Sequence, residues 1–407
     1  MTRLIRLLLV VISPLLLVAV LSSWLAHSAI ASPSGVCDLD AQLPSGAYYR
    51  ICMPSGTWNG DLVLYAHGYV AFNEPITIPE NQLQLPDGTS LPELVNSLGF
   101  AFATTSYRVN GLAIENSVDD LIDVVNVFSA THGVPTHTLV TGVSEGGLVT
   151  VLAIERRPDV FDGGLSTCGP IGDFSQQINY FGDFRVLFDY FFPGVMPGSP
   201  ISIPQSLIAN WPAYYTMTIQ PLIFAPTNTA QLEQLLRVSH APYVSGVITT
   251  INKSVFDALD YSVMATNDAI EKLGGQPFDN QDRVYTGSAD DAQLNLLVQR
   301  FTADQTALNN IDALYQTTGQ LSVPLVTLHT TLDQQVPYWH EPLYRVKVIQ
   351  SDSLALHQPI EINRYGHCNF EASEVVGAFL QLVSLVLNPP EPYASPRLYL
   401  PVIAVGQ

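Results

Sequence analysis

Thr138-Leu139-Val140-Thr141-Gly142-Val143-Ser144-Glu145-Gly146-Gly147 is the stretch of this sequence that decides the fold. It begins as an apolar, β-branched run, which is typical of a strand, and the following Leu148–Ile154 is typical of a helix. Gly-x-Ser-x-Gly between a strand and a helix is the pattern of a nucleophile elbow, a sharp turn that lifts a serine out of a sheet. Gly142 and Gly146 leave room for such a turn around Ser144. Because a short pattern also recurs by chance, its meaning depends on the rest of the chain.

Outward from the elbow, the sequence alternates between strand-like and helix-like segments. The runs at 61–68 and 100–107 are continuously apolar rather than alternating, which indicates a parallel sheet covered on both faces. Between Ser117 and Ser129 the apolar residues have helical spacing, and Ser117 with Asp120 predicts the start of that helix. Further strands are expected at 164–168, 324–329 and 359–365, and an amphipathic helix at about 371–387. The pattern predicts a doubly wound, mostly parallel α/β fold.

A long middle segment interrupts this alternation. Residues 173–320 begin with a cluster of aromatic residues and continue through three helix-like stretches, around 232–237, 255–273 and 291–301. We expect a mainly helical cap over the carboxyl edge of the sheet, with the aromatic residues packing cap against core in preference to contacting substrate. The predicted organisation is therefore a core in two parts, 32–172 and 321–388, separated by the cap. A Pro-rich tail at 389–407 could be a linker with an edge strand, a sorting tail or a disordered end.

The composition excludes several classes of partner. The 407-residue chain has a net charge of −20 and no basic stripe, so nucleic acid is not an expected partner. It contains no Gly-x-Gly-x-x-Gly or phosphate loop, no His-Glu-x-x-His, no Cys-x-x-Cys and no calcium loop. We therefore expect neither a cofactor nor a metal ion.

The N-terminus and the cysteines point to export. Residues 1–31 have the layout of a signal peptide, with Arg3 and Arg6 before an apolar run and a small-residue cleavage site after Ala31. An uncleaved membrane anchor is the alternative, because the apolar run is long enough to span a bilayer. After cleavage no further membrane span is expected.

An oxidising compartment would pair the four cysteines, and three pairings are possible. Cys37 and Cys52 flank an expected hairpin and are near in sequence, which favours their pairing. That choice leaves Cys168 with Cys368.

Two later positions supply the partners that a nucleophilic serine requires. A serine hydroxyl needs a histidine to accept its proton and an acid to orient that histidine. Asp333 lies in the loop after the strand at 324–329, and His367 follows the strand at 359–365, which gives the order Ser, Asp, His of hydrolases with this elbow. Asp304 or Asp312 could replace Asp333. His329 and His340 are expected to be structural, and the histidines at 132, 137, 240 and 357 lack an acid-loop or strand-end context.

The oxyanion of an acyl-transfer reaction needs backbone donors. One is expected at the N–H of Glu145, directly after the serine and at a helix N-terminus. The second is expected at the N–H of Tyr69, in the loop His67-Gly68-Tyr69 after an early strand. His67 itself is expected to be structural.

With these motifs in place, the chain resembles the α/β-hydrolase superfamily over most of residues 36–390. The Gly-x-Ser-x-Gly-Gly form and the Asp333-x-x-Val-Pro loop are most similar to the prolyl-oligopeptidase and dienelactone-hydrolase branch. The pair His367-Cys368 resembles tannases and feruloyl esterases, in which the residue after the catalytic histidine is disulfide-bonded near the serine. Those enzymes carry a cysteine where this chain has Val143, and Cys168 offers an analogous tether.

Together, the residues and the resemblance predict a secreted or cell-envelope serine hydrolase. It would cleave carboxylic esters through an acyl-enzyme formed on Ser144, with a small-molecule or polymeric ester substrate that carries an apolar or aromatic group. A peptidase or amidase would share every motif and is the alternative. A non-catalytic binding protein on the same fold is the other.

Overall fold

The computed structural model describes residues 35–389. The expected signal peptide and nearly all of the expected C-terminal tail lie outside the described residues. No helix within residues 35–389 is long and apolar enough to cross a membrane.

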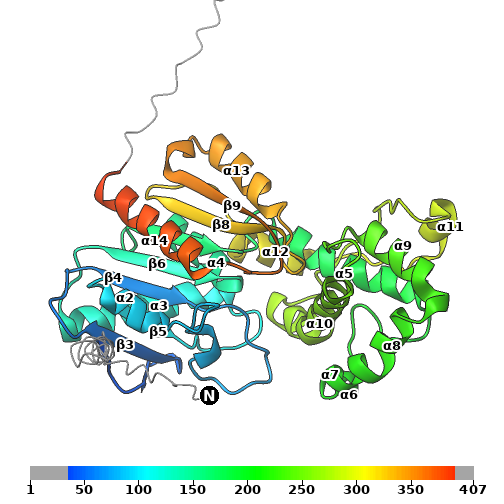
Figure 1. Ribbon diagram of the computed structural model, residues 1–407, viewed down its shortest axis with the longest axis horizontal. Helices are drawn as coiled ribbons and strands as arrows, with labels where there is room; N and C mark the ends of the chain where they lie inside the picture. Colours follow the sequence, from blue (N-terminus) through cyan, green and yellow to red (C-terminus); the bar gives the residue numbers. More distant parts are fainter. Residues whose placement is uncertain (1–34, 390–407) are drawn as a thin grey trace, which may run out of the picture.

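One twisted sheet runs through the described part of the chain (Figure 1). Its strands lie in the order β1-β3-β5-β4-β6-β7-β8-β9, and β2 also pairs with β3. The strands from β5 to β9 are parallel, whereas β1, β2 and β3 form an antiparallel edge. This arrangement confirms the predicted mostly parallel sheet. The strands are β1 (Gly35–Cys37), β2 (Ala41–Gln42), β3 (Tyr48–Pro54), β4 (Leu62–Ala66), β5 (Ala101–Thr105), β6 (Thr138–Val143), β7 (Gly163–Thr167), β8 (Leu325–Leu332) and β9 (His357–Tyr365).

Helices cover both faces of the sheet, which is why its central strands are apolar on both sides. Within β4, Leu62 and Leu64 pack on the face covered by α3 and α4, whereas Val63 and Tyr65 pack on the face covered by α2 and α14. The helices that connect or follow the strands are α2 (Leu91–Ser97), α3 (Ile114–His132), α4 (Glu145–Arg156), α13 (His340–Gln350) and α14 (Ala372–Leu387). Short 3-10 turns lie at Glu80–Gln82 and Leu354–Leu356.

The predicted start of α3 was wrong. The helix begins at Ile114, three residues before Ser117, and Ala113 is its N-cap. The Ser117 hydroxyl donates back to the Ala113 carbonyl at 2.7 Å, while the Asp120 carboxylate pairs with Arg108. Short polar side chains can bond to their own helix or to distant partners as well as cap a helix, and the sequence does not distinguish these uses.

The segment between β7 and β8 is helical and has a hydrophobic cluster of its own (green to yellow in Figure 1). The last helix of the segment packs differently, because its residues Ala307 and Ile311 belong to the hydrophobic cluster on the α3 and α4 face of the sheet. Its helices are α5 (Phe174–Phe191), α6 (Gln205–Ile208), α7 (Trp211–Tyr214), α8 (Gln220–Ile223), α9 (Thr229–Ser239), α10 (Ile248–Leu273), α11 (Asp291–Leu297) and α12 (Gln305–Leu314), with a π-helical turn at Tyr215–Ile219 and a 3-10 turn at Pro226–Asn228.

The described residues contain two disulfides. Cys37 and Cys52 stand opposite each other in the β1–β3 ladder and are bonded. Cys168, just after β7, is bonded to Cys368 in the loop after β9. The structure therefore contains the pairing that the sequence favoured.

Candidate active site

The elbow is a strained turn that requires residues without side chains on both sides of the serine. Ser144 has φ 57° and ψ −122°, a region that L residues with side chains rarely occupy. A Cβ at Gly142 would lie 2.0 Å from the Gly146 carbonyl oxygen, and one at Gly146 would lie 2.0 Å from that of Ala66. Both glycines are therefore required by close backbone contacts, as the sequence predicted for the turn.

Gly146→Ala tests this steric requirement. The added Cβ meets backbone that cannot move aside as a side chain could, so we expect the free energy of unfolding to fall by about 3 kcal/mol, the upper end for overpacking. Urea unfolding measures the change. Gly377 in α14 is the control, because a Cβ there meets nothing within 4 Å. Gly377→Ala should stabilise the protein by about 0.5–1 kcal/mol. Equal effects of the two substitutions would contradict the steric argument.

Ser144, His367 and Asp333 form a hydrogen-bonded row at the carboxyl edge of the sheet. The Ser144 Oγ lies 2.8 Å from His367 Nε2, and His367 Nδ1 lies 2.8 Å from Asp333 Oδ2. Since a carboxylate can only accept, His367 carries its proton on Nδ1 and leaves Nε2 free to accept the serine proton. The three residues come from loops after β6, β8 and β9, which converge because parallel strands end at the same edge.

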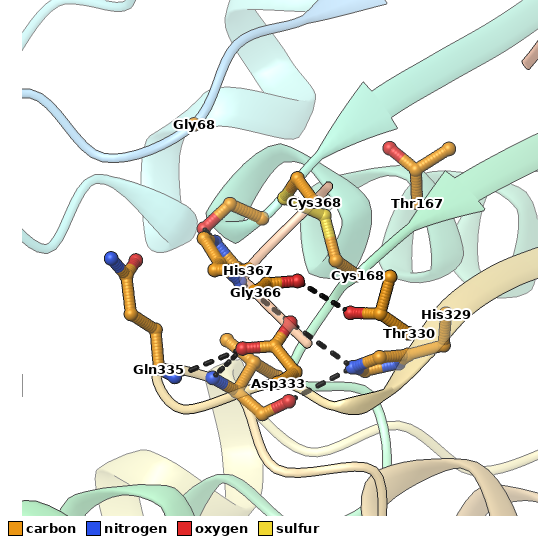
Figure 2. The surroundings of a disulfide bond; sticks show 12 residues. Gly68, Thr167, Cys168, His329, Thr330, Asp333, Gln335, Gly366, His367 and Cys368 are labelled. Atoms are coloured by element: carbon orange, nitrogen blue, oxygen red, sulfur yellow. Dashed lines mark hydrogen bonds and ion pairs between the residues drawn. A yellow bond between two sulfur atoms is a disulfide. The ribbon is translucent and has the colours of Figure 1, made fainter. Parts of the chain in front are cut away.

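Asp333 is anchored on several sides (Figure 2). Its Oδ1 accepts hydrogen bonds from the backbone N–H groups of Gln335 and Val336, each at 2.9 Å. Burial favours the protonated form of this carboxyl, yet electrostatic attraction and hydrogen bonding with His367 and His329 outweigh burial and hold its pKa well below the usual range. Asp333 thus caps its own turn and also holds His367. Asp304, one of the alternative acids, instead accepts from the Gln276 N–H at 2.7 Å.

His329 is a buried partner that the sequence did not connect to this row. Its Nε2 donates to the Val336 carbonyl at 2.8 Å and lies 3.5 Å from Asp333 Oδ2. Its Nδ1 lies 3.3 Å from the Glu341 carboxylate. Burial opposes its charge, but Asp333 and Glu341 raise the pKa of His329 to about 10. It is therefore a structural cation between two carboxylates. The only sequence signal was a histidine four residues before the acid.

Gln334 fixes the loop that carries His367. Its Oε1 accepts from the His367 backbone N–H at 3.1 Å, and its Nε2 donates to Asp257 of α10 at 2.6 Å. The Cys168–Cys368 disulfide holds the same loop to the end of β7, next to the elbow (Figure 2). The Asp333 carboxylate, the Gln334 side chain and this disulfide therefore together set the position of the imidazole.

Two other histidines that the sequence assigned to structure are neutral. His67 is buried against the ring of Tyr107, with centroids 4.1 Å apart, and burial lowers its pKa to about 4. His340 accepts the Gly172 N–H on Nδ1 at 2.9 Å and donates from Nε2 to Gln177 at 2.7 Å. Burial lowers the pKa of His340 well below its usual value.

Two backbone donors flank Ser144. Within residues 35–389, the N–H groups of Tyr69 and Glu145 donate no hydrogen bond. The loop that carries Tyr69 is held by Gln82, whose Oε1 accepts the Gly68 N–H at 2.7 Å and whose Nε2 donates to the Tyr69 carbonyl at 3.2 Å. A Cβ at Gly68 would lie 3.2 Å from the Ser144 Cβ, so this loop runs directly beside the serine.

The Glu145 side chain is an unexpected feature of the elbow. It is buried, and its Oε1 accepts only the Ala113 N–H, at 2.8 Å. Burial therefore raises its pKa to about 8. A neutral carboxyl here avoids placing a negative charge beside the serine at neutral pH.

The raised pKa of Glu145 predicts a pH dependence of stability. The folded state holds this proton more tightly than the unfolded state, so stability falls as pH rises from about 4.5 to about 8 and then levels off. Each unit of pKa difference corresponds to about 1.4 kcal/mol. Glu145→Gln mimics the protonated form, so at pH 9 it should unfold at a higher urea concentration than the parent, and near pH 4 at a similar one. The exposed Glu233→Gln is the control; identical pH profiles of parent and E145Q would contradict this account.

Two cavities meet at Ser144. A cavity of about 420 Å³ lies on the α2 and α14 face of the sheet and also touches His367. A second, of about 100 Å³, lies between the elbow and the helices α5 and α10, and is lined by Glu145 and Phe181. The aromatic start of the inserted segment was expected to pack the cap against the core. Phe184 and Phe188 instead pack in the core of the segment itself, and Phe181 faces the cavity.

Comparison with known proteins agrees with this arrangement. Residues 96–177, which include the elbow, match the model of the prolyl oligopeptidase family. No curated protein sequence matches the chain. An esterase from Aspergillus oryzae has a similar structure, with a TM-score of 0.53 and 13% identity over 86% of this chain and 78% of that chain.

Two further solved structures are more distant. Feruloyl esterase B from Aspergillus oryzae has a TM-score of 0.45 and 13% identity, covering 87% of this chain and 81% of that chain. The Pyrococcus horikoshii acylaminoacyl peptidase has a TM-score of 0.41 and 10% identity, covering 86% of this chain but 41% of that chain.

Proposed function

This chain has the α/β-hydrolase fold, and on that premise we propose that it is a serine hydrolase that cleaves carboxylic esters through an acyl-enzyme. The observation that carries the proposal is the row Ser144–His367–Asp333, with both links at 2.8 Å. A serine in this environment can lose its proton to His367 while it attacks a carbonyl carbon.

The first half of the proposed reaction forms the acyl-enzyme. Ser144 Oγ bonds to the carbonyl carbon as its proton passes to His367 Nε2, and the carbonyl oxygen becomes an oxyanion. The N–H groups of Glu145 and Tyr69, which have no other acceptor among the described residues, donate to that oxyanion. His367 then returns the proton to the leaving alcohol oxygen as the ester C–O bond breaks. Asp333 holds the imidazole and stabilises its charged form.

The second half releases the acid. Water takes the place of the alcohol, gives its proton to His367 and attacks the acyl carbon. The oxyanion forms again in the same position, and collapse expels Ser144, which recovers its proton from His367. Neither half requires a cofactor. The inserted segment 173–320 is proposed as a cap over this site, since α5 and α10 supply Phe181 and Tyr261 to the cavity at the serine.

We further propose that the protein works outside the cytoplasm. Two disulfides among the described residues are compatible with an oxidising compartment, and the expected signal peptide would deliver it there.

A peptidase is the second candidate function, because residues 96–177 match the model of the prolyl oligopeptidase family. Esters and amides of the same acyl group distinguish the two. The ester hydrolase proposal expects turnover of the ester to exceed that of the matched amide by far more than their difference in intrinsic reactivity. Efficient turnover of the amide would favour the peptidase.

A further inference from the structure

The two cavities at Ser144 differ about fourfold in volume, at about 420 and 100 Å³. We propose that the enzyme selects asymmetric esters, with one long apolar chain in the large cavity and a group of only a few atoms in the small one. This inference rests on the proposed ester hydrolase function and specifies its substrate class.

The lining of the large cavity suits an apolar group. It extends from Ser144 between the sheet and two helices, with Val63 and Leu165 on the sheet side, Leu94 on α2, and Val376 and Phe379 on α14. Its lining, all within the described residues, contains no Asp, Glu, Lys or Arg. A charged substrate group would therefore be desolvated there without a partner, whereas a hydrocarbon chain would lose water at no such cost.

The small cavity is lined by stacked aromatic rings. Phe181 of α5 and Tyr261 of α10 stack with centroids 4.7 Å apart and an interplanar angle of 9°. Phe174 and Ile178 line the same space. An apolar cavity of about 150 Å³ holds a benzene molecule, so a volume of about 100 Å³ limits the group to a few heavy atoms, the size of an acetyl or an ethoxy group.

Tyr69 and Tyr261 separate the two cavities, since both rings line both spaces and their centroids are 5.5 Å apart. An ester bound at Ser144 must therefore send its two substituents to opposite sides of this pair of rings. Well-packed proteins rarely keep empty apolar space, because each void costs stability. The large cavity also falls within the roughly 300–1,000 Å³ typical of ligand sites.

Three isomeric esters test the proposal. Methyl octanoate is long on the acyl side, heptyl acetate is long on the alcohol side, and butyl pentanoate is balanced. Because the isomers have nearly equal hydrophobicity, differences in kcat/KM report the shape of the site. One of the two asymmetric isomers should exceed butyl pentanoate at least tenfold, and its identity shows whether the long chain is acyl or alkoxy. When the long chain of the preferred isomer is extended, each added methylene should raise kcat/KM about threefold to fourfold until the cavity is full.

Variants assign the preference to the two cavities. Val376→Trp places an indole in the large cavity, so the ratio of the preferred isomer to ethyl acetate should fall at least tenfold. Leu380→Trp is the matched control, because Leu380 lies one turn further along α14, is 48% exposed and does not line the cavity. Phe181→Ala enlarges the small cavity and should raise turnover of butyl pentanoate relative to the preferred isomer.

Labelling by a fluorophosphonate and hydrolysis of ethyl acetate separate the cavity assignment from the hydrolase proposal. If Ser144 reacts with a fluorophosphonate and ethyl acetate is hydrolysed, but neither asymmetric isomer exceeds butyl pentanoate tenfold, the cavity assignment is wrong and the hydrolase proposal stands. An equal effect of V376W and L380W also overturns the assignment. If Ser144 reacts with neither probe nor ester, both proposals fall.

Discussion

Replacing Ser144 by alanine is expected to lower kcat for ester hydrolysis by about 10⁶-fold, the scale seen when the nucleophile of a serine hydrolase is removed. The Ser144 side chain makes one hydrogen bond, to His367, and the backbone N–H that bonds to the Thr167 carbonyl is unchanged by the substitution. The fold should therefore survive. Initial rates with a short p-nitrophenyl ester measure the loss, and Tm measures the fold.

Labelling with a fluorophosphonate sharpens this test. The parent should be labelled at Ser144, and S144A should not be labelled. Ser206→Ala, at an exposed position on α6, is the control and should keep both activity and labelling. Undiminished turnover by S144A would remove the serine from the reaction. A parent protein that is properly folded but does not react with the probe would favour the non-catalytic alternative.

Replacing Asp333 by asparagine is expected to lower kcat by about 10⁴-fold. Asparagine can still accept the N–H groups of Gln335 and Val336, so the turn should persist. It cannot stabilise the imidazolium that forms on His367 during the reaction, and its amide N–H₂ can turn toward Nδ1 and impose the wrong tautomer. The loss should therefore appear in kcat more than in KM.

Stability must be measured with activity in this case, because Asp333 also lies 3.5 Å from His329. D333N leaves His329 with Glu341 as its remaining anion, so a moderate fall in Tm is expected alongside the loss of activity. Asp312→Asn is the matched control from the alternative acids; it is exposed on α12 and should change neither quantity. A loss of less than tenfold in D333N would show that another acid orients His367.

The fold was predictable from local sequence to a large extent. Continuous apolar runs indicated strands covered on both faces, and the sheet confirms them. The resemblance to the α/β-hydrolase superfamily, and to its prolyl-oligopeptidase branch, is likewise confirmed. The start of α3 was wrong because Ser117 and Asp120 use their polar groups on Ala113 and Arg108. Those partners could not be known without the fold.

The candidate site was predictable where a role follows from a position beside a strand end. Ser144, Asp333 and His367 each follow a strand, and parallel strands bring such loops together. The roles of His329, Gln334 and the Glu145 side chain could not be predicted in this way, because each depends on burial and on a partner from another element.

The sequence by itself determined the elbow, the order of the three residues and the sheet that gathers them, because backbone sterics and apolar periodicity are local properties. Only the tertiary structure decided the anchors of His367, the neutral carboxyl at Glu145 and the unequal cavities on either side of Ser144. A pKa depends on desolvation, and a cavity depends on which side chains from distant segments fail to fill the space between them. Both are properties of packing, and packing is not encoded at any single stretch of the chain.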